Sequence, residues 1–189
     1  MRIVAGSLRG RRLAAPEGLE VRPTGARARE AVFNILEHGH LGRDGGSVFA
    51  DATVLDAFAG TGAMGLEALS RGAASAVFLD SDRRAIAAIR ANIATCGVDA
   101  RALVMPADLR VPPQARAACD LIFLDPPYGV GLAGPALAAL AAAGWFAPDA
   151  LICLELGPED AWPETAGLTV LDERRYGKAR VIFLRNGSD

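Results

Sequence analysis

The chain has 189 residues, of which 51% are hydrophobic, and this length and composition suit a single folded unit with a sizeable core. Its formal net charge of −2 at pH 7 would disfavour a nucleic-acid partner if the charges were evenly spread. They are not, because residues 1–43 hold eight arginines and four glutamates, and the rest of the chain is acidic. No apolar run reaches membrane-spanning length and no signal sequence opens the chain, so we expect a cytoplasmic protein without a membrane partner.

Cysteines and histidines are few. Cys96, Cys119 and Cys153 lack the paired spacing of a disulfide framework, so we expect them to be reduced and buried. His38 and His40 have no further histidine to complete a zinc site, and we expect no metal.

Residues 1–43 are predicted to form a basic N-terminal extension. Arg9, Arg11 and Arg12 lie between two short strand-like pieces, a pattern typical of a β-hairpin that presents guanidinium groups to phosphates. A solvated basic loop would give the same pattern. Residues 26–36 have apolar side chains at near-helical spacing and should form a helix that packs on the sheet. The glycine-rich residues 42–46 are the expected boundary with a second domain, residues 44–189.

Residues 53–65 predict a strand, a glycine turn and the start of a helix. The glycines at 60, 62 and 65 match the dinucleotide fingerprint, and Asp80 follows at the distance of a ribose-binding acid, so a nicotinamide-dependent oxidoreductase is one interpretation. Asp56 disfavours it, because a carboxylate just before the glycines would repel a pyrophosphate. Asp56 suits S-adenosylmethionine, which has an ammonium group, a sulfonium and no phosphate.

Further acids follow the next two expected strands. Asp80 would accept hydrogen bonds from ribose hydroxyls, and Asp108, after a strand over residues 101–105, from the adenine amino group. Each of these acids could instead cap a helix or lie in a loop. The expected cofactor-binding residues are Asp56, Phe58, Gly60, Gly62, Asp80, Ser81, Asp108 and Asp125.

Residues 121–128 read as a buried parallel strand that ends in Asp125-Pro126-Pro127-Tyr128. Ligands of open α/β sheets lie beyond the carboxyl ends of such strands. The prolines lack N–H donors, so nearby carbonyls stay free, and Tyr128 offers a flat face. This set suits a nucleobase with an exocyclic amino group, although the four residues could also be a rigid turn. The expected catalytic residues are Asp125, Pro126 and Tyr128.

The alternation of strand and helix patterns from residue 53 onward predicts a doubly wound, mostly parallel α/β sheet. Residues 168–184 should close it as an antiparallel hairpin.

The two motifs, at residues 56–62 and 125–128, together resemble S-adenosylmethionine-dependent amino methyltransferases that act on nucleobase nitrogens. With Arg9-Gly10-Arg11-Arg12, Arg22-Pro23-Thr24 and Arg27-x-Arg29-Glu30, nearly the whole chain is similar to the RsmD-type family of bacterial 16S ribosomal RNA guanine-N2 methyltransferases.

This resemblance implies a seven-stranded class I methyltransferase sheet with an N-terminal hairpin, and S-adenosylmethionine as cofactor. It implies methylation of the N2 amine of the guanine that the family numbers 966, in 16S rRNA of the small ribosomal subunit or its assembly intermediate, by a monomer. The implied RNA-binding residues are Arg9, Arg11, Arg12, Arg22, Thr24 and Arg27. A DNA adenine-N6 methyltransferase shares both motifs and stays open, because the Asp-Pro-Pro-Tyr acceptors hold any amino group, although the chain has little room for a DNA-recognition domain.

Overall fold

The computed structural model describes residues 1–15, 23–39, 41–42, 45–161, 163 and 167–187. In this part the helices are α1 (Pro23–His38), α2 (Ala63–Ser70), α3 (Arg83–Cys96) and α4 (Ala133–Ala142), with a short 3-10 helix η2 (Asp99–Arg101). The strands are β1 (Thr53–Ala57), β2 (Ser75–Asp80), β3 (Ala102–Pro106), β4 (Cys119–Leu124), β5 (Phe146–Leu156), β6 (Leu168–Tyr176) and β7 (Ala179–Asn186).

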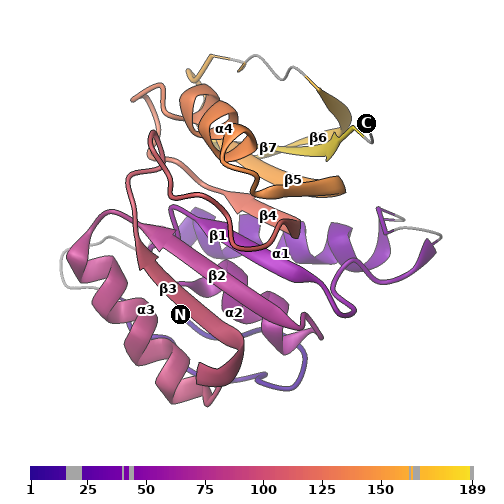
Figure 1. Ribbon diagram of the computed structural model, residues 1–189. Coiled ribbons are helices and arrows are strands. Elements are labelled where there is room, and N and C mark those ends of the chain that lie inside the picture. Colours follow the sequence, from indigo (N-terminus) through magenta and orange to yellow (C-terminus); the bar gives the residue numbers. More distant parts are fainter. Residues whose placement is uncertain (16–22, 40, 43–44, 162, 164–166, 188–189) are drawn as a thin grey trace.

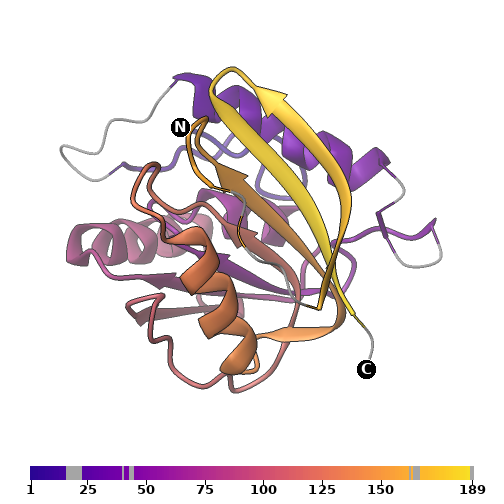
Figure 2. The same ribbon diagram turned by 90° about the horizontal axis from the view of Figure 1, so that it is seen from above.

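All seven strands form one sheet in the order β3-β2-β1-β4-β5-β7-β6 (Figure 1). The first five strands along this order pair in parallel, and β7 pairs antiparallel with both β5 and β6. Strands β6 and β7 form a hairpin that runs alongside α1 (Figure 2). The predicted doubly wound, mostly parallel sheet with a closing antiparallel hairpin is confirmed.

The sheet separates two apolar cores. Neighbouring residues of a strand point to opposite faces, so Val54 and Leu55 of β1, both fully buried, enter different cores. Helices α1, α2 and α3 cover the face with Val54, and α4 covers the face with Leu55. Burial on both sides explains why the central strands read as continuous apolar runs. Because all parallel strands end at one edge, the loops after β1, β2, β3 and β4 lie together there.

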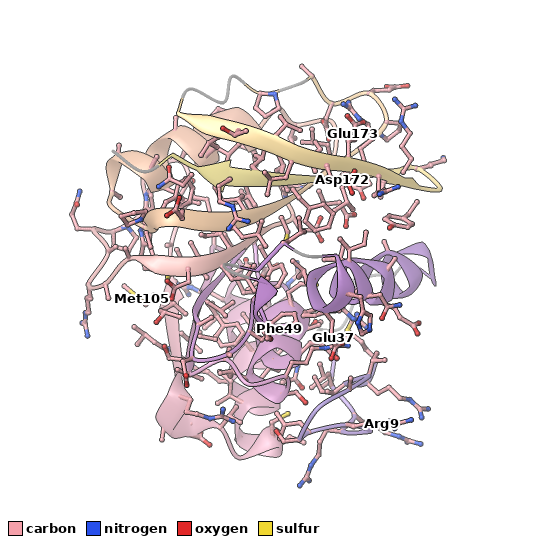
Figure 3. All side chains as sticks on the ribbon, turned by 90° about the vertical axis from the view of Figure 1, so that its right-hand side faces the viewer. Arg9, Glu37, Phe49, Met105, Asp172 and Glu173 are labelled. Carbon is pink, nitrogen blue, oxygen red and sulfur yellow. The ribbon has the colours of Figure 1, made fainter. Side chains whose placement is uncertain are left out.

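The N-terminal segment forms the predicted hairpin. Arg2 and Arg12 make an antiparallel bridge, and the Ile3 amide donates to the Arg11 carbonyl at 3.0 Å. Arg9 lies in the turn between these two pieces and points away from the body of the protein (Figure 3). The helix predicted over residues 26–36 is longer, since it begins at Pro23, a residue favoured at the first helical position because its missing N–H would have no partner there.

Buried polar side chains of α2 hold this hairpin against that helix. Glu67, 1% exposed, accepts hydrogen bonds from the backbone amides of Val4 and Ala5 at 2.8 and 3.0 Å. The Ser70 carbonyl accepts from the Ser7 amide at 2.8 Å, and the Ser70 hydroxyl donates to the Ala5 carbonyl.

Helix α3 adds a further contact through Asn92, which is 1% exposed. Its side-chain amide exchanges two hydrogen bonds with the backbone of Ala14 and donates another to the Thr61 carbonyl, in the glycine turn. The hairpin is therefore held in a fixed position relative to the loop that follows β1.

We expect Gly65→Ala to destabilise the protein by about 1 to 3 kcal/mol, because the added Cβ would lie 2.4 Å from Cε1 of the Phe78 ring in β2. Gly134→Ala is the matched control in a helix, since its Cβ would meet its nearest neighbour, on Pro163, at 3.4 Å. The control should be neutral or stabilising by up to about 1 kcal/mol. Urea denaturation of both variants measures the difference, and equal effects would contradict the close-packing role of Gly65.

Candidate active site

Asp56 is a buried carboxylate at the end of β1. It is 3% exposed, and its Oδ2 accepts a hydrogen bond from the Gly65 amide, in the first turn of α2, at 2.9 Å. The pKa of Asp56 is raised to about 8, chiefly by burial and to a lesser degree by the nearby charges of Asp125 and Asp80, while the hydrogen bond from Gly65 opposes the rise. A cationic ligand at this point would favour the ionised form of Asp56.

The glycine turn after β1 is held by the acid that ends β2. Asp80 Oδ2 accepts from the Gly60 amide at 2.8 Å, and Oδ1 accepts from the Asp82 amide at 2.9 Å. Gly60 and Gly62 have φ of 56° and 75°, a left-handed conformation that glycine adopts without strain. Phe58 also has a positive φ, 58°, and Ser81 is exposed just after Asp80.

Asp108 lies two residues beyond the end of β3, at the same edge of the sheet. Its carboxylate accepts from the Arg110 amide at 2.9 Å and from the Arg110 guanidinium at 2.6 Å. These hydrogen bonds lower the pKa of Asp108 to about 2. The group is therefore ionised at neutral pH and available as an acceptor.

The Asp-Pro-Pro-Tyr segment follows β4. Asp125 is exposed, Pro126 is buried, and the Asp125 amide donates to the carbonyl of Ala57 at the end of β1. The Tyr128 hydroxyl donates to Glu155 Oε1. The Tyr128 ring lies against Gly157, where a Cβ would be 2.7 Å from the Tyr128 Cγ atom.

A second carboxylate fixes this loop against the segment after β5. Asp160 accepts from the amides of Gly129 and Gly157, each at 2.7 Å. The position of Tyr128 is thus set by residues some thirty positions further along the chain, which no local pattern indicates.

One open cavity joins the ends of β1 and β4. Its lining includes both predicted acids, Asp56 and Asp125, together with Phe58 and Gly60. It also includes residues that sequence reasoning missed: Met1, Arg29, Met64, Cys153 and Glu155. Glu155 lies near the end of β5, and Asp125 directly follows the neighbouring strand β4. An acid at the end of an apolar strand is the one sequence signal that could have identified Glu155 as a site residue.

The predicted RNA-binding residues lie on the N-terminal extension. Arg9, Arg11 and Arg12 are exposed on the hairpin. Thr24 and Arg27 belong to α1, although the structure describes only the backbone there, and Arg22 lies outside the described residues.

Within the described residues, no group of three or more His, Cys, Asp or Glu side chains is arranged to hold a metal ion. The three cysteines are free and buried, and burial raises the pKa of Cys119 to about 12. No helix in the described ranges is long and apolar enough to cross a membrane.

The strand order, with β7 inserted antiparallel beside β5, defines a class I methyltransferase. Solved structures of similar proteins agree. The "Putative methyltransferase yhhF" of Escherichia coli superposes with a TM-score of 0.83 at 33% identity, covering 100% of this chain and 99% of that one. The "putative methylase HI0767" of Haemophilus influenzae has a TM-score of 0.76 at 30% identity, covering 99% and 98%.

Sequence comparison identifies the family. The family model "Conserved hypothetical protein 95" matches residues 1–185. The "Ribosomal RNA small subunit methyltransferase D" of E. coli K12 is 37% identical over 163 residues, which are 86% of this chain and 78% of that protein. The "Putative rRNA methyltransferase YlbH" of Bacillus subtilis is 33% identical over 193 residues, covering 99% and 100%. The chain belongs to this family, the RsmD family, as its motifs predicted, and the glycine turn is therefore part of a methyltransferase.

We expect Asp56 to make stability fall as pH rises from about 4 to about 8. Between the pKa of an unfolded aspartate and the raised pKa near 8, the folded protein keeps a proton that the unfolded chain releases, so the unfolded state binds fewer protons. The effect is at most about 1.4 kcal/mol per pH unit. Asp56→Asn cannot titrate, so the unfolding free energy of the wild type relative to this variant should decrease from pH 5 to 8 in urea denaturation. Parallel pH curves for the two proteins would show that Asp56 is ionised in the fold.

Proposed function

We propose that this protein transfers a methyl group from S-adenosylmethionine to the N2 amine of a guanine in 16S rRNA, at the site that the family numbers 966. The observation that carries the proposal is the single cavity that Asp125 shares with Asp56, Phe58 and Gly60. Asp125, which could accept hydrogen bonds from the target amine, thus lines the same cavity as Asp56, which could stabilise a cationic cofactor. The names of the relatives, which refer to ribosomal RNA of the small subunit, support the choice of RNA.

The residues at this edge of the sheet fit the cofactor. S-adenosylmethionine supplies a methyl group made electrophilic by a sulfonium. Asp56 lies where a cationic group would be stabilised, and the glycine turn allows close approach of the backbone. Asp80 accepts two amide hydrogen bonds, and a carboxylate has about four acceptor sites, so it can also accept from ribose hydroxyls. Asp108, ionised beside Arg110, can accept from the adenine amino group.

Asp125 and the Pro126 carbonyl would accept the two hydrogens of the target amine. Holding both hydrogens orients the nitrogen lone pair toward the methyl group, and positioning at about 3 to 3.5 Å supplies much of the acceleration. The N–H proton becomes acidic as the nitrogen gains its fourth bond, so Asp125 or water would accept it late. Tyr128, fixed by Glu155 and Gly157, would stack on the base. The guanine must be unpaired or flipped to enter this site.

Residues 1–43 would bind RNA, and residues 44–189 would carry out the chemistry. Arg9, Arg11 and Arg12 are exposed on a hairpin that Glu67 and Asn92 tie to α2 and α3, so phosphate contacts there would be fixed relative to the cavity. We propose that the enzyme acts as a monomer in the cytoplasm, on the small subunit or its assembly intermediate.

The test uses purified protein and labelled S-adenosylmethionine with small ribosomal subunits from a strain that lacks its own member of this family. Digestion of the rRNA should yield N2-methylguanosine, and genomic DNA should acquire no N6-methyladenine. Methylated adenine in DNA, with rRNA left unmodified, would overturn the proposal in favour of a DNA methyltransferase.

We expect Asp125→Ala to abolish methyl transfer and to leave cofactor affinity within a few-fold of wild type, because the proposed partner of Asp125 is the target amine. Single-turnover transfer and calorimetry with S-adenosylhomocysteine measure the two effects. Near-normal turnover in this variant would refute the assigned role.

Replacing Arg9, Arg11 and Arg12 with alanine should weaken RNA binding and flatten its dependence on salt, since each lost phosphate contact removes about 0.7 to 0.9 from the log–log slope. The matched control replaces three exposed arginines outside the N-terminal extension, Arg90, Arg116 and Arg175. Filter binding between 50 and 200 mM salt, over which the screening length falls from about 14 to about 7 Å, compares the two triple variants. An unchanged slope in the hairpin variant would show that the hairpin is only a solvated loop.

A further inference from the structure

The charges that line the cavity are unevenly arranged. Three of the described side chains that line it carry a carboxyl group: Asp56, Asp125 and Glu155. Arg29 is the one arginine or lysine among the described side chains of the lining. Arg29 comes from α1, which packs on the same face of the sheet as α2. Arg29 and Val32 are the described residues that α1 contributes to the cavity, and Arg29 is the charged one of the two.

Arg29 is held in the cavity without a direct carboxylate partner. Its neighbours Ala28 and Val32 are buried and fix this part of α1, and Arg29 itself is half-buried. Within the described part of the chain, no carboxylate forms a salt bridge with its guanidinium. Desolvation lowers the pKa of Arg29, while the charges of Glu67 and Glu30 act in the opposite direction from a distance.

Glu67 is already engaged elsewhere. Its two oxygens accept from the amides of Val4 and Ala5, and it pairs with Arg71 at 2.9 Å. A partly desolvated guanidinium gains most from an anion that comes into the cavity with the ligand.

The amino-acid end of the proposed cofactor carries such an anion. It has an ammonium group, which carboxylates stabilise, and an α-carboxylate, which the same carboxylates repel. The arginine fork matches a carboxylate with two parallel hydrogen bonds. We infer that Arg29 binds the α-carboxylate of S-adenosylmethionine, an assignment that rests on the proposed function and adds a cofactor contact from outside the β1–β4 motifs.

The test compares two ligands that differ at one group. Decarboxylated S-adenosylmethionine keeps the ammonium, sulfonium, methyl and adenosine groups and lacks only the carboxylate. Calorimetry measures both ligands on the wild type, on Arg29→Met, on Arg29→Lys and on the control Arg90→Met, whose arginine is exposed on α3. Thermal melting checks that each variant is folded.

Arg29→Met should weaken S-adenosylmethionine by about 10- to 100-fold, the range of a lost hydrogen bond to a charged group, and leave the decarboxylated ligand within two-fold. Arg29→Lys should give an intermediate loss, and Arg90→Met none. The wild type should itself prefer S-adenosylmethionine by a similar factor, a comparison that needs no variant.

Three results would overturn the assignment in different ways. An equal loss for both ligands would show that Arg29 only supports the cavity wall. No loss for either ligand would show that Arg29 does not bind the cofactor, and filter binding of the same variants to RNA would then show whether Arg29 contacts the substrate instead. A wild type that binds neither ligand would overturn the proposed cofactor, and this inference with it.

Discussion

The burial of one carboxylate, Asp56, under the first turn of α2 is the interaction on which the rest of the site depends. Its hydrogen bond to the Gly65 amide sets where α2 begins, and Gly65 lets that helix approach the Phe78 ring closely. Helix α2 then places Glu67 and Ser70, whose contacts hold the N-terminal hairpin. A single acid at the end of β1 is thus connected, through one helix, to the arrangement of both the cavity and the extension beside it.

Buried apolar side chains and buried polar side chains have different structural roles in this protein. The apolar cores follow from strands buried on both faces, and they would tolerate many similar side chains. The buried polar side chains all bind backbone groups, Asp56 in the first turn of α2 and the other three, Glu67, Ser70 and Asn92, in the N-terminal segment or the glycine turn. Asn92 binds both at once. Such contacts add little net stability, because desolvation offsets them, but a misplaced hairpin would leave them unsatisfied.

The sequence predicted the parts of the site that follow from strand ends. Asp56 and Asp125 each adjoin an apolar run, and parallel strands end at one edge, so their meeting in one cavity could be foreseen. Arg29 and Glu67 could not be placed in this way, because they lie on helices whose orientation depends on tertiary packing. Asp160 could not be placed from local patterns either, because it lies in the segment after β5 and fixes the loop of Tyr128 through the distant Gly129 amide. The start of α1 was missed although Pro23 is a recognised first helical residue.

The position of β7 in the sheet has a consequence for synthesis of the chain. This strand, the last in sequence, lies between β5 and β6 and is their shared neighbour. Until residues 179–186 have been made, the apolar stretch of β5 from Leu151 to Leu156 has one unpaired edge. Exposed edges of this kind invite pairing with other chains. The edge of β5 is therefore covered only once β7, which follows all the other described strands in sequence, has been inserted beside it.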